Sequence, residues 1–214
     1  MKAERRFLPI EVRADEDGKI RGHGAVFYNA DDPGTEYELW TNVFERVMPG
    51  AFTETIANDD IRSFFNHDPS LILGRNRAGT LKLGEDARGF TYEVDAPDTQ
   101  AGRDTKTSIA RGDVTGSSFM FQPVEERWIV DEENDREIRE IHKAKVFEVG
   151  PVTFPAYESA DTSVRDLRTA REAEKTSRDA DEDEARAENE RRDNLQAQID
   201  RDKLALRIRI AEMG

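Results

Sequence analysis

The sequence predicts a mainly β fold of the α+β class, followed by a charged helical tail. Short runs rich in β-branched and aromatic residues alternate with turn residues through the first 160 positions. Several breaks between these runs carry a glycine, a spacing typical of an antiparallel meander or barrel: Gly74, Gly79, Gly84 and Gly89. From Asp161 onward the chain has no aromatic residue and is dominated by charge. We therefore expect a β domain over residues 1–160 and a tail over residues 161–214.

The composition excludes several classes of function. With 36% charged residues and a mean hydropathy of -0.81, the chain is too polar to be one globule of its 214 residues. Its net charge of -14 disfavours nucleic acid or an anionic membrane as the main partner. The absence of cysteine and the presence of only 3 histidines argue against a metal site, and we expect no cofactor. No apolar run approaches the roughly 20 residues that span a bilayer, and no signal-peptide pattern opens the chain, so a cytoplasmic setting is expected.

Helix and strand signals follow one another in a definite order. Two apolar-rich runs, 5–13 and 19–28, flank an Asp-Gly turn and predict a hairpin. Helices are expected at 51–57, where Phe52 and Ile56 stand four apart, and at 98–111, before the stop signal Gly112. An acidic loop is expected at 131–135, and the remaining strands at 61–65, 71–75, 80–83, 89–94, 112–121, 123–130 and 136–154.

The strand at 112–121 carries the first candidate for chemistry. Side chains alternate faces along a strand, so Ser117, Phe119 and Phe121 share one side while Ser118 lies on the other. The two phenylalanines mark the core side, which leaves Ser118 facing away from the core as a candidate nucleophile. The alternative is that both serines are small polar fillers of a strand. The choice depends on partners elsewhere in the chain.

His67 is the candidate base. It stands before Asp68-Pro69, where the preceding strand must stop because proline cannot donate a backbone hydrogen bond. A histidine at such a strand end is held by the scaffold yet open to substrate, and neutral imidazole suits proton transfer from a serine. Judged alone, His67 is evenly balanced between a catalytic residue and a surface turn residue. His23, between two glycines, is interpreted as a partly exposed strand residue.

Glu148 is the candidate that would orient a histidine. On an ideal strand it shares a face with His142, Val146 and Gly150, and a carboxylate on a mainly apolar face needs a partner. An acidic third group selects the histidine tautomer and stabilises the imidazolium. The alternative is a strand-edge glutamate bonded to the backbone or to an arginine. His142 lies roughly 20 Å from Glu148 along an extended strand, so both serve one site only if a bulge intervenes.

The tail over residues 161–214 has little apolar content until its last 20 residues or so. There an apolar residue recurs at helical spacing, which predicts a helix with one apolar stripe: Leu195, Ile199, Leu206, Ile210 and Met213. A partner-binding helix, a coiled coil and a partly disordered arm all fit this pattern.

Four motifs in this order resemble a known family. They are Pro49-Gly50-Ala51-Phe52, then Asn66-His67-Asp68 with Leu73-Gly74-Arg75, then Gly116-Ser117-Ser118-Phe119-Met120-Phe121, then Phe147-Glu148-Val149-Gly150-Pro151-Val152-Thr153-Phe154-Pro155-Ala156-Tyr157. Over roughly residues 5–160, the set resembles the tailed-phage prohead maturation proteases of the HK97 type. Each motif alone is weak, and their order makes the resemblance specific.

The resemblance implies a fold and a set of catalytic residues. The family is distantly similar to the herpesvirus assembly proteases, which implies a closed, mostly antiparallel β-barrel flanked by helices. The family's serine falls on Ser118, its histidine on His67 and its third member on Glu148. The herpesvirus relatives use a histidine in the third role, which keeps His142 as a substitute. Met120 departs from the family pattern, in which a glycine is common at this position.

The resemblance also implies an activity and partners. It implies a serine endopeptidase that cleaves the major capsid protein's scaffolding segment or a separate scaffold, and its own tail, during prohead maturation. The setting would be the assembling procapsid in the host cytoplasm, with self-association to a homo-oligomer as a further expectation. The alternative is a non-catalytic capsid assembly or scaffolding protein that keeps the barrel and binds capsid subunits through its tail. The pairing of His67 with Ser118 discriminates the two, because a pure scaffold needs neither.

Overall fold

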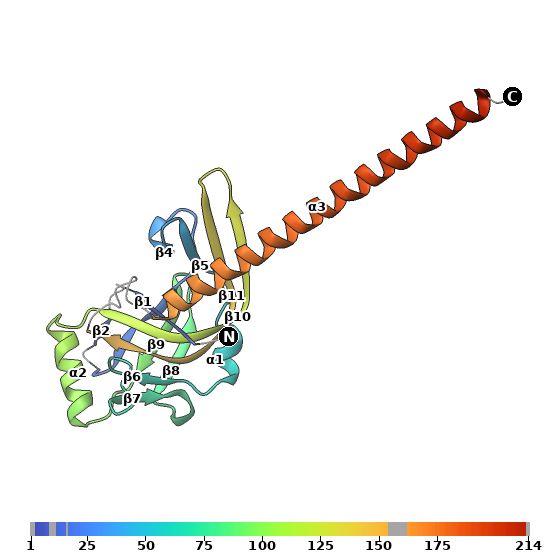
Figure 1. The fold of residues 1–214 in the computed structure, drawn as a ribbon. Helices are drawn as coiled ribbons and strands as arrows, with labels where there is room; N and C mark the ends of the chain where they lie inside the picture. Colours follow the sequence, from blue (N-terminus) through green and yellow to red (C-terminus); the bar gives the residue numbers. More distant parts are fainter. Residues whose placement is uncertain (1–2, 9–11, 16, 154–161, 213–214) are drawn as a thin grey trace. The chain divides into compact units, whose positions relative to one another are not determined.

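The computed structural model of the protein describes residues 3–8, 12–15, 17–153 and 162–212. Contacts divide the chain into two compact units, residues 1–165 and residues 166–214. The first unit holds the strands and two α-helices, and the second is helical (Figure 1). The end of the fourth motif, 154–157, and the expected boundary between residues 160 and 161 lie outside the described residues.

The larger sheet is built around a long hairpin, β10 (Gly116–Asp131) and β11 (Arg136–Val152). Its turn, residues 132–135, lies within the acidic loop expected from the sequence. The strand β1 (Glu4–Leu8) pairs antiparallel with β10, whereas β5 (Val43–Val47) and β6 (Arg62–Phe64) pair in parallel with successive parts of β11. The strands β4 (Glu36–Trp40) and β7 (Ile72–Arg75) complete its 7 strands.

The smaller sheet has 4 strands in the order β2 (Arg13–Ala14), β3 (Ile20–Val26), β9 (Gly89–Val94) and β8 (Leu81–Glu85). A hairpin forms across the Asp-Gly turn between β2 and β3, as expected. It is shorter than expected, because residues 5–8 of the first apolar-rich run lie in β1 and pair with β10. Both expected helices are present, α1 (Thr53–Asn58) and α2 (Gln100–Ala110). Two single 3₁₀ turns connect strands, η1 (Pro33–Thr35) and η2 (Asn76–Ala78).

One hydrophobic cluster draws residues from both sheets. Phe52, just before α1, packs on Phe90 of β9 with ring centroids 4.8 Å apart, and it meets Phe119 of β10 edge-on at 5.7 Å. Phe119 and Phe121 stack at 4.8 Å. Aromatic pairs of this kind contribute buried area and a preferred geometry at once. The core side of β10 is therefore the side that carries Phe119 and Phe121.

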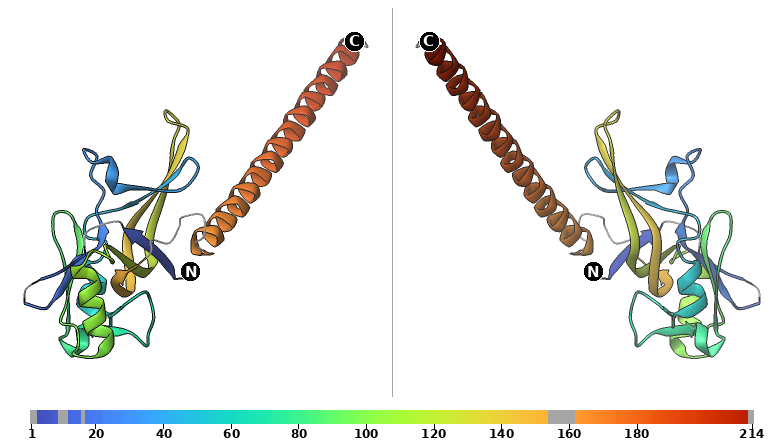
Figure 2. Two further views of the ribbon diagram at one scale, coloured as in Figure 1. Left: turned by 90° about the vertical axis from the view of Figure 1, so that its left-hand side faces the viewer. Right: turned by 90° about the vertical axis from the view of Figure 1, so that its right-hand side faces the viewer.

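The structure corrects the expectation of a closed barrel. Within the described residues the strands form two open sheets, with β1 and β4 at the ends of the main path of the larger sheet and β2 and β8 at the ends of the smaller. A barrel requires the first and last strands to pair. Here β11 pairs with β5 along residues 137–141 and with β6 at Glu148, so the larger sheet divides along one strand. The tip of the β10–β11 hairpin extends well past β1 in both views of Figure 2.

The helical tail is confirmed. Its helix, α3 (Thr162–Glu212), is continuous over 51 residues. Ion pairs one turn apart, such as Arg168 with Glu172 at 2.8 Å, support it by only a few tenths of a kcal/mol each, about 0.2–0.5. In the parts of the chain that the structure describes, none of the helices combines the length and apolarity needed to span a bilayer.

Candidate active site

The strand β10 places its two serines on opposite faces. Ser117 is fully buried, and its hydroxyl oxygen lies 2.8 Å from the hydroxyl oxygen of Tyr92 in the smaller sheet. It therefore lies on the core side with Phe119 and Phe121, as the alternation predicts. Burial raises the pKa of the Tyr92 hydroxyl above its ordinary value, against the opposing effect of the Ser117 hydrogen bond. Ser117 is thus a core partner of Tyr92, and Ser118 is the serine on the other face.

Ser118 lies between two neighbouring strands. Its partners in the sheet are Phe7 of β1 and Gly150 of β11. The residue is 4% exposed, and its hydroxyl donates a 2.9 Å hydrogen bond to the backbone oxygen of Arg6. The hydroxyl is therefore engaged by the backbone of β1.

A strained turn after β6 presents His67. Both Asn66 and His67 have left-handed backbones, with φ of 54° and 60°, a conformation that costs a residue other than glycine roughly 1–3 kcal/mol. The Asn66 N–H donates to the backbone oxygen of Pro151 at 3.1 Å. Its side chain accepts from the Thr153 N–H at 2.8 Å and donates to the Thr153 hydroxyl at 3.1 Å. These three hydrogen bonds clamp the turn to the end of β11.

The ring of His67 is bonded to Glu148. Nδ1 of the histidine lies 2.5 Å from Oε1 of the glutamate, which is 3% exposed. An ionised carboxylate only accepts hydrogen bonds, so a neutral imidazole in this contact carries its proton on Nδ1 and keeps the lone pair on Nε2. This is the tautomer in which an imidazole can accept a proton from a hydroxyl.

A β-bulge sets the direction of Glu148. Met120 pairs with Glu148 but Phe121 pairs with Val146, so Phe147 is an extra residue on β11. Opposed residues of an antiparallel pair point to the same side, which places Val146 on the core side with Phe121 and Glu148 on the other side. The expectation that Glu148 shares a face with Val146 is therefore wrong, because the bulge reverses the alternation between them.

Gly150 allows the chain that leads to His67 to pack on β11. A Cβ atom at this position would lie 2.2 Å from the backbone oxygen of Phe64 and 3.0 Å from the hydroxyl of Ser63. Only glycine permits such a close approach of two backbones. Ser118 is the direct partner of Gly150 on β10. The three candidate residues thus come from neighbouring parts of one sheet: β10, β11 and the end of β6.

His142 has a different partner. Its Nε2 lies 3.0 Å from Oε2 of Glu140, two residues away on the same strand. The carboxylate bonded to His67 is that of Glu148.

A buried group of charges beside β1 was not foreseen from the sequence. We call it the β1 charge cluster, and it consists of Glu4, Arg6, Glu45, Glu126 and Arg139. Arg6 bonds Glu45 at 2.6 and 2.8 Å, and Arg139 bonds both Glu4 and Glu45 at 2.8–2.9 Å. Burial alone would raise the pKa of Glu4, but the hydrogen bond from Arg139 and the charge of Arg6 hold that pKa below its ordinary value.

The sequence contains one signal for this cluster. Glu45 alternates with Val43 and Val47 along β5, and all three side chains are buried. A carboxylate in the middle of an apolar alternation needs a cation as its partner. The sequence of β5 does not show which arginines supply the charge. Arg6 lies 39 residues and Arg139 lies 94 residues from Glu45 along the chain, and both reach it across the sheet.

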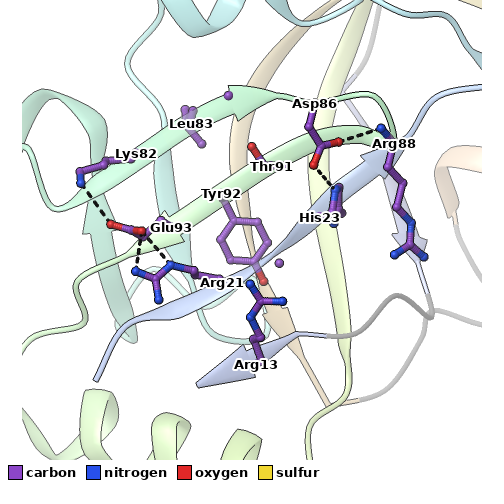
Figure 3. A pocket seen from close by; sticks show the side chains of 12 residues that line it. Arg13, Arg21, His23, Lys82, Leu83, Asp86, Arg88, Thr91, Tyr92 and Glu93 are labelled. Carbon is purple, nitrogen blue, oxygen red and sulfur yellow. Dashed lines mark hydrogen bonds and ion pairs between the residues drawn. The ribbon is translucent and has the colours of Figure 1, made fainter. Parts of the chain in front are cut away.

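A pocket of about 370 Å³ lies on the smaller sheet (Figure 3). Several of its charged side chains bond one another: His23 Nε2 lies 3.0 Å from Asp86, and Glu93 accepts from Arg21 and Lys82. Ser118, His67 and Glu148 do not line it. Among the described residues, no group of three His, Asp or Glu side chains could hold a metal ion.

A histidine held by a buried carboxylate, with a serine on the adjoining strand, supplies the side chains of a serine hydrolase of the triad type. Comparison with known families agrees with this class: the sequence model of the Caudovirus prohead serine protease family matches residues 8–177. The chain belongs to this family, and it is accordingly a serine protease of phage capsid maturation. No curated protein and no solved structure gives a significant match to the chain.

Proposed function

We propose that Ser118 is the nucleophile of this protease, that His67 is its general base and acid, and that Glu148 orients His67. The contact of 2.5 Å between His67 and Glu148 is the observation that carries the proposal. A buried carboxylate bonded to a partly buried histidine, one strand from a serine, has no role in a protein that only binds capsid subunits. It therefore favours the protease over the scaffolding alternative.

Each residue has a defined part in the reaction. The oxygen of Ser118 bonds to the carbonyl carbon of the scissile peptide while Nε2 of His67 takes the hydroxyl proton. The imidazolium, stabilised by Glu148, then returns this proton to the leaving amine as the C–N bond breaks. Water attacks the acyl-enzyme with His67 again as base, which releases the acid and restores Ser118. Backbone N–H groups are expected to stabilise the oxyanion in both steps.

The substrates follow from the family. We propose that the protease cleaves the scaffolding segment of the major capsid protein or a separate scaffold, within the procapsid assembling in the host cytoplasm. The continuous helix α3 is proposed as the segment that docks on capsid or scaffold subunits and as a target of self-cleavage, with self-association accompanying assembly.

Coexpression with the capsid protein tests the proposal. Ser118→Ala should abolish processing while the protein stays folded, and Ser117→Ala, on the neighbouring residue, should retain it. A fluorophosphonate probe should label Ser118 in the natural protein and leave His67→Ala unlabelled. Unchanged processing by Ser118→Ala would disprove the assignment.

A further inference from the structure

The strand β1 covers the proposed nucleophile. Five residue pairs join it antiparallel to β10, from Glu4 with Phe121 to Leu8 with Ser117, and Phe7 lies directly opposite Ser118. The Ser118 hydroxyl donates to the Arg6 carbonyl oxygen at 2.9 Å and is not free to meet another chain. With 4% of Ser118 exposed, a substrate cannot reach its oxygen while β1 is in place.

A peptide substrate needs the position that β1 occupies. Proteases commonly hold the substrate as an extended strand, paired through its backbone with a strand of the enzyme. The edge of β10 beside Ser118 is the edge that β1 takes. The Arg6 carbonyl oxygen accepts the hydrogen bond of the Ser118 hydroxyl at 2.9 Å, so the backbone of β1 stands where the backbone of a substrate would have to approach the nucleophile.

The charges on β1 allow it to leave as a unit. Glu4 and Arg6 bond each other at 2.6 Å and carry no net charge together. When they depart, Arg139 keeps Glu45 at 2.9 Å and Glu126 at 2.5 Å. Removing one partner of a buried ion pair is costly because it strands the other charge. Here Glu45 loses its two bonds to Arg6 but keeps its bond to Arg139, so no charge is left without a partner of opposite sign.

From this geometry, and resting on the proposed function of Ser118, we propose that β1 is an inhibitory strand in the substrate site. The resting protein fills the site with its own residues 4–8. Activation releases β1, and an extended segment of the substrate then pairs antiparallel with β10 in its place. Folded segments are excluded as substrates, because only an extended chain can form this pairing.

The chain contains no cysteine, so a thiol at position 118 reports directly on access. In Ser118→Cys, alkylation by iodoacetamide should be slow. Adding Glu4→Gln and Arg6→Gln, which removes the balanced pair, should speed alkylation at least tenfold in protein that remains folded by circular dichroism. The matched control adds Lys19→Gln and Glu93→Gln, a balanced pair 2.9 Å apart in the smaller sheet, and should leave the rate unchanged. Equal rates in all three proteins would overturn the proposal.

A reversible cross-link tests the same point with Ser118 intact. Arg5 and Met120 are opposed across β1 and β10, a separation that a disulfide can bridge, so Arg5→Cys with Met120→Cys should lock β1. The oxidised protein should neither cleave substrate nor take up a fluorophosphonate, and reduction should restore both. A lock between Lys82→Cys and Glu93→Cys, opposed across β8 and β9, should have no such effect.

The two experiments separate failure of this inference from failure of the proposed function. Full activity in the oxidised Arg5–Met120 lock overturns the role of β1 and leaves Ser118 as nucleophile. Absence of labelling at Ser118 in the protein with Glu4→Gln and Arg6→Gln, in which β1 is expected to be released, rejects Ser118 as nucleophile. In that case the alkylation rates still decide whether β1 covers position 118.

Discussion

Nδ1 of His67 and Oε1 of Glu148 lie 2.5 Å apart although 81 residues separate them in the chain. The contact forms because β6, which leads to His67, pairs in parallel with β11 at Glu148 itself. The left-handed turn at Asn66 and His67 then brings the imidazole back over the strand. The sheet thus fixes both members of the pair.

We expect Glu148→Gln to lower kcat by about 10²- to 10⁴-fold, because an amide neither selects the productive tautomer nor stabilises the imidazolium as a carboxylate does. The protein should remain folded, since the amide has the size of the carboxylate and can bond His67. Cleavage of a peptide substrate under single-turnover conditions, with the melting temperature measured alongside, checks this expectation.

The matched control is Glu140→Gln, which removes the carboxylate bonded to His142 on the same strand. It should leave kcat within about twofold of the natural protein. If Glu140→Gln or His142→Ala lowered kcat more than Glu148→Gln does, His142 and not Glu148 would be the residue that orients His67.

Local alternation is the part of the site that the sequence predicts well. The alternation along β10 put Ser117 with Phe119 and Phe121, and the structure confirms that side as the core. Over this stretch β10 is regular, and the period of two is reliable. The same rule failed at Glu148, because the bulge at Phe147 inserts one residue and nothing in the composition of that strand marks it.

Long-range pairing is the part that could not be predicted. The glycine-rich spacing indicated a meander or barrel, but whether the sheet closes depends on which strands pair with β11. Along the chain, β5 lies 94 residues and β6 lies 86 residues from their partners on that strand. Neither the pairing of β1 with β10 nor the Arg6 carbonyl at Ser118 has a local signature. Contacts of this kind arise from the topology and not from the pattern of any one segment.

Ser117→Ala should destabilise the protein without removing activity. It leaves the buried Tyr92 hydroxyl without its partner, a change that costs about 1–3 kcal/mol. The double variant Ser117→Ala with Tyr92→Phe should lose less than the sum of the two single variants, because no polar group is then stranded. Urea unfolding of the four proteins measures the coupling, and strict additivity would show that the two hydroxyls do not interact.

Gly150→Ala should damage both stability and catalysis. The added Cβ would lie 2.2 Å from the Phe64 backbone oxygen, so the segment that leads to His67 has to move. We expect a loss of about 1–3 kcal/mol in unfolding free energy and a fall in kcat larger than the change in KM. Gly84→Ala is the control, because its Cβ would meet only the Thr91 side chain at 3.2 Å. Equal effects at the two positions would argue against a special role for the Gly150 contact.

The β1 charge cluster predicts a specific pH dependence of stability. The pKa of Glu4 is lower in the folded protein than its ordinary value of 4.5, so between these two values the unfolded chain binds more protons than the folded one. The contribution of Glu4 to stability is therefore full above about pH 4.5 and is lost as the pH falls through the folded-state pKa. Arg6, Arg139, Glu45 and Glu126 are the charges that face it.

Glu4→Gln isolates this contribution from that of the other carboxylates. At pH 7 the variant should be less stable than the natural protein by about 3 kcal/mol, the low end for a broken buried pair, because the remaining cluster has two cations and two anions. This gap in unfolding free energy between the two proteins should narrow as the pH falls below about 4.5, since protonated Glu4 is, like glutamine, uncharged. Denaturant unfolding of both proteins at pH 7, 5, 4 and 3 measures the gap. A gap that stays constant over this range would show that the ionised form of Glu4 does not hold β1 to the sheet.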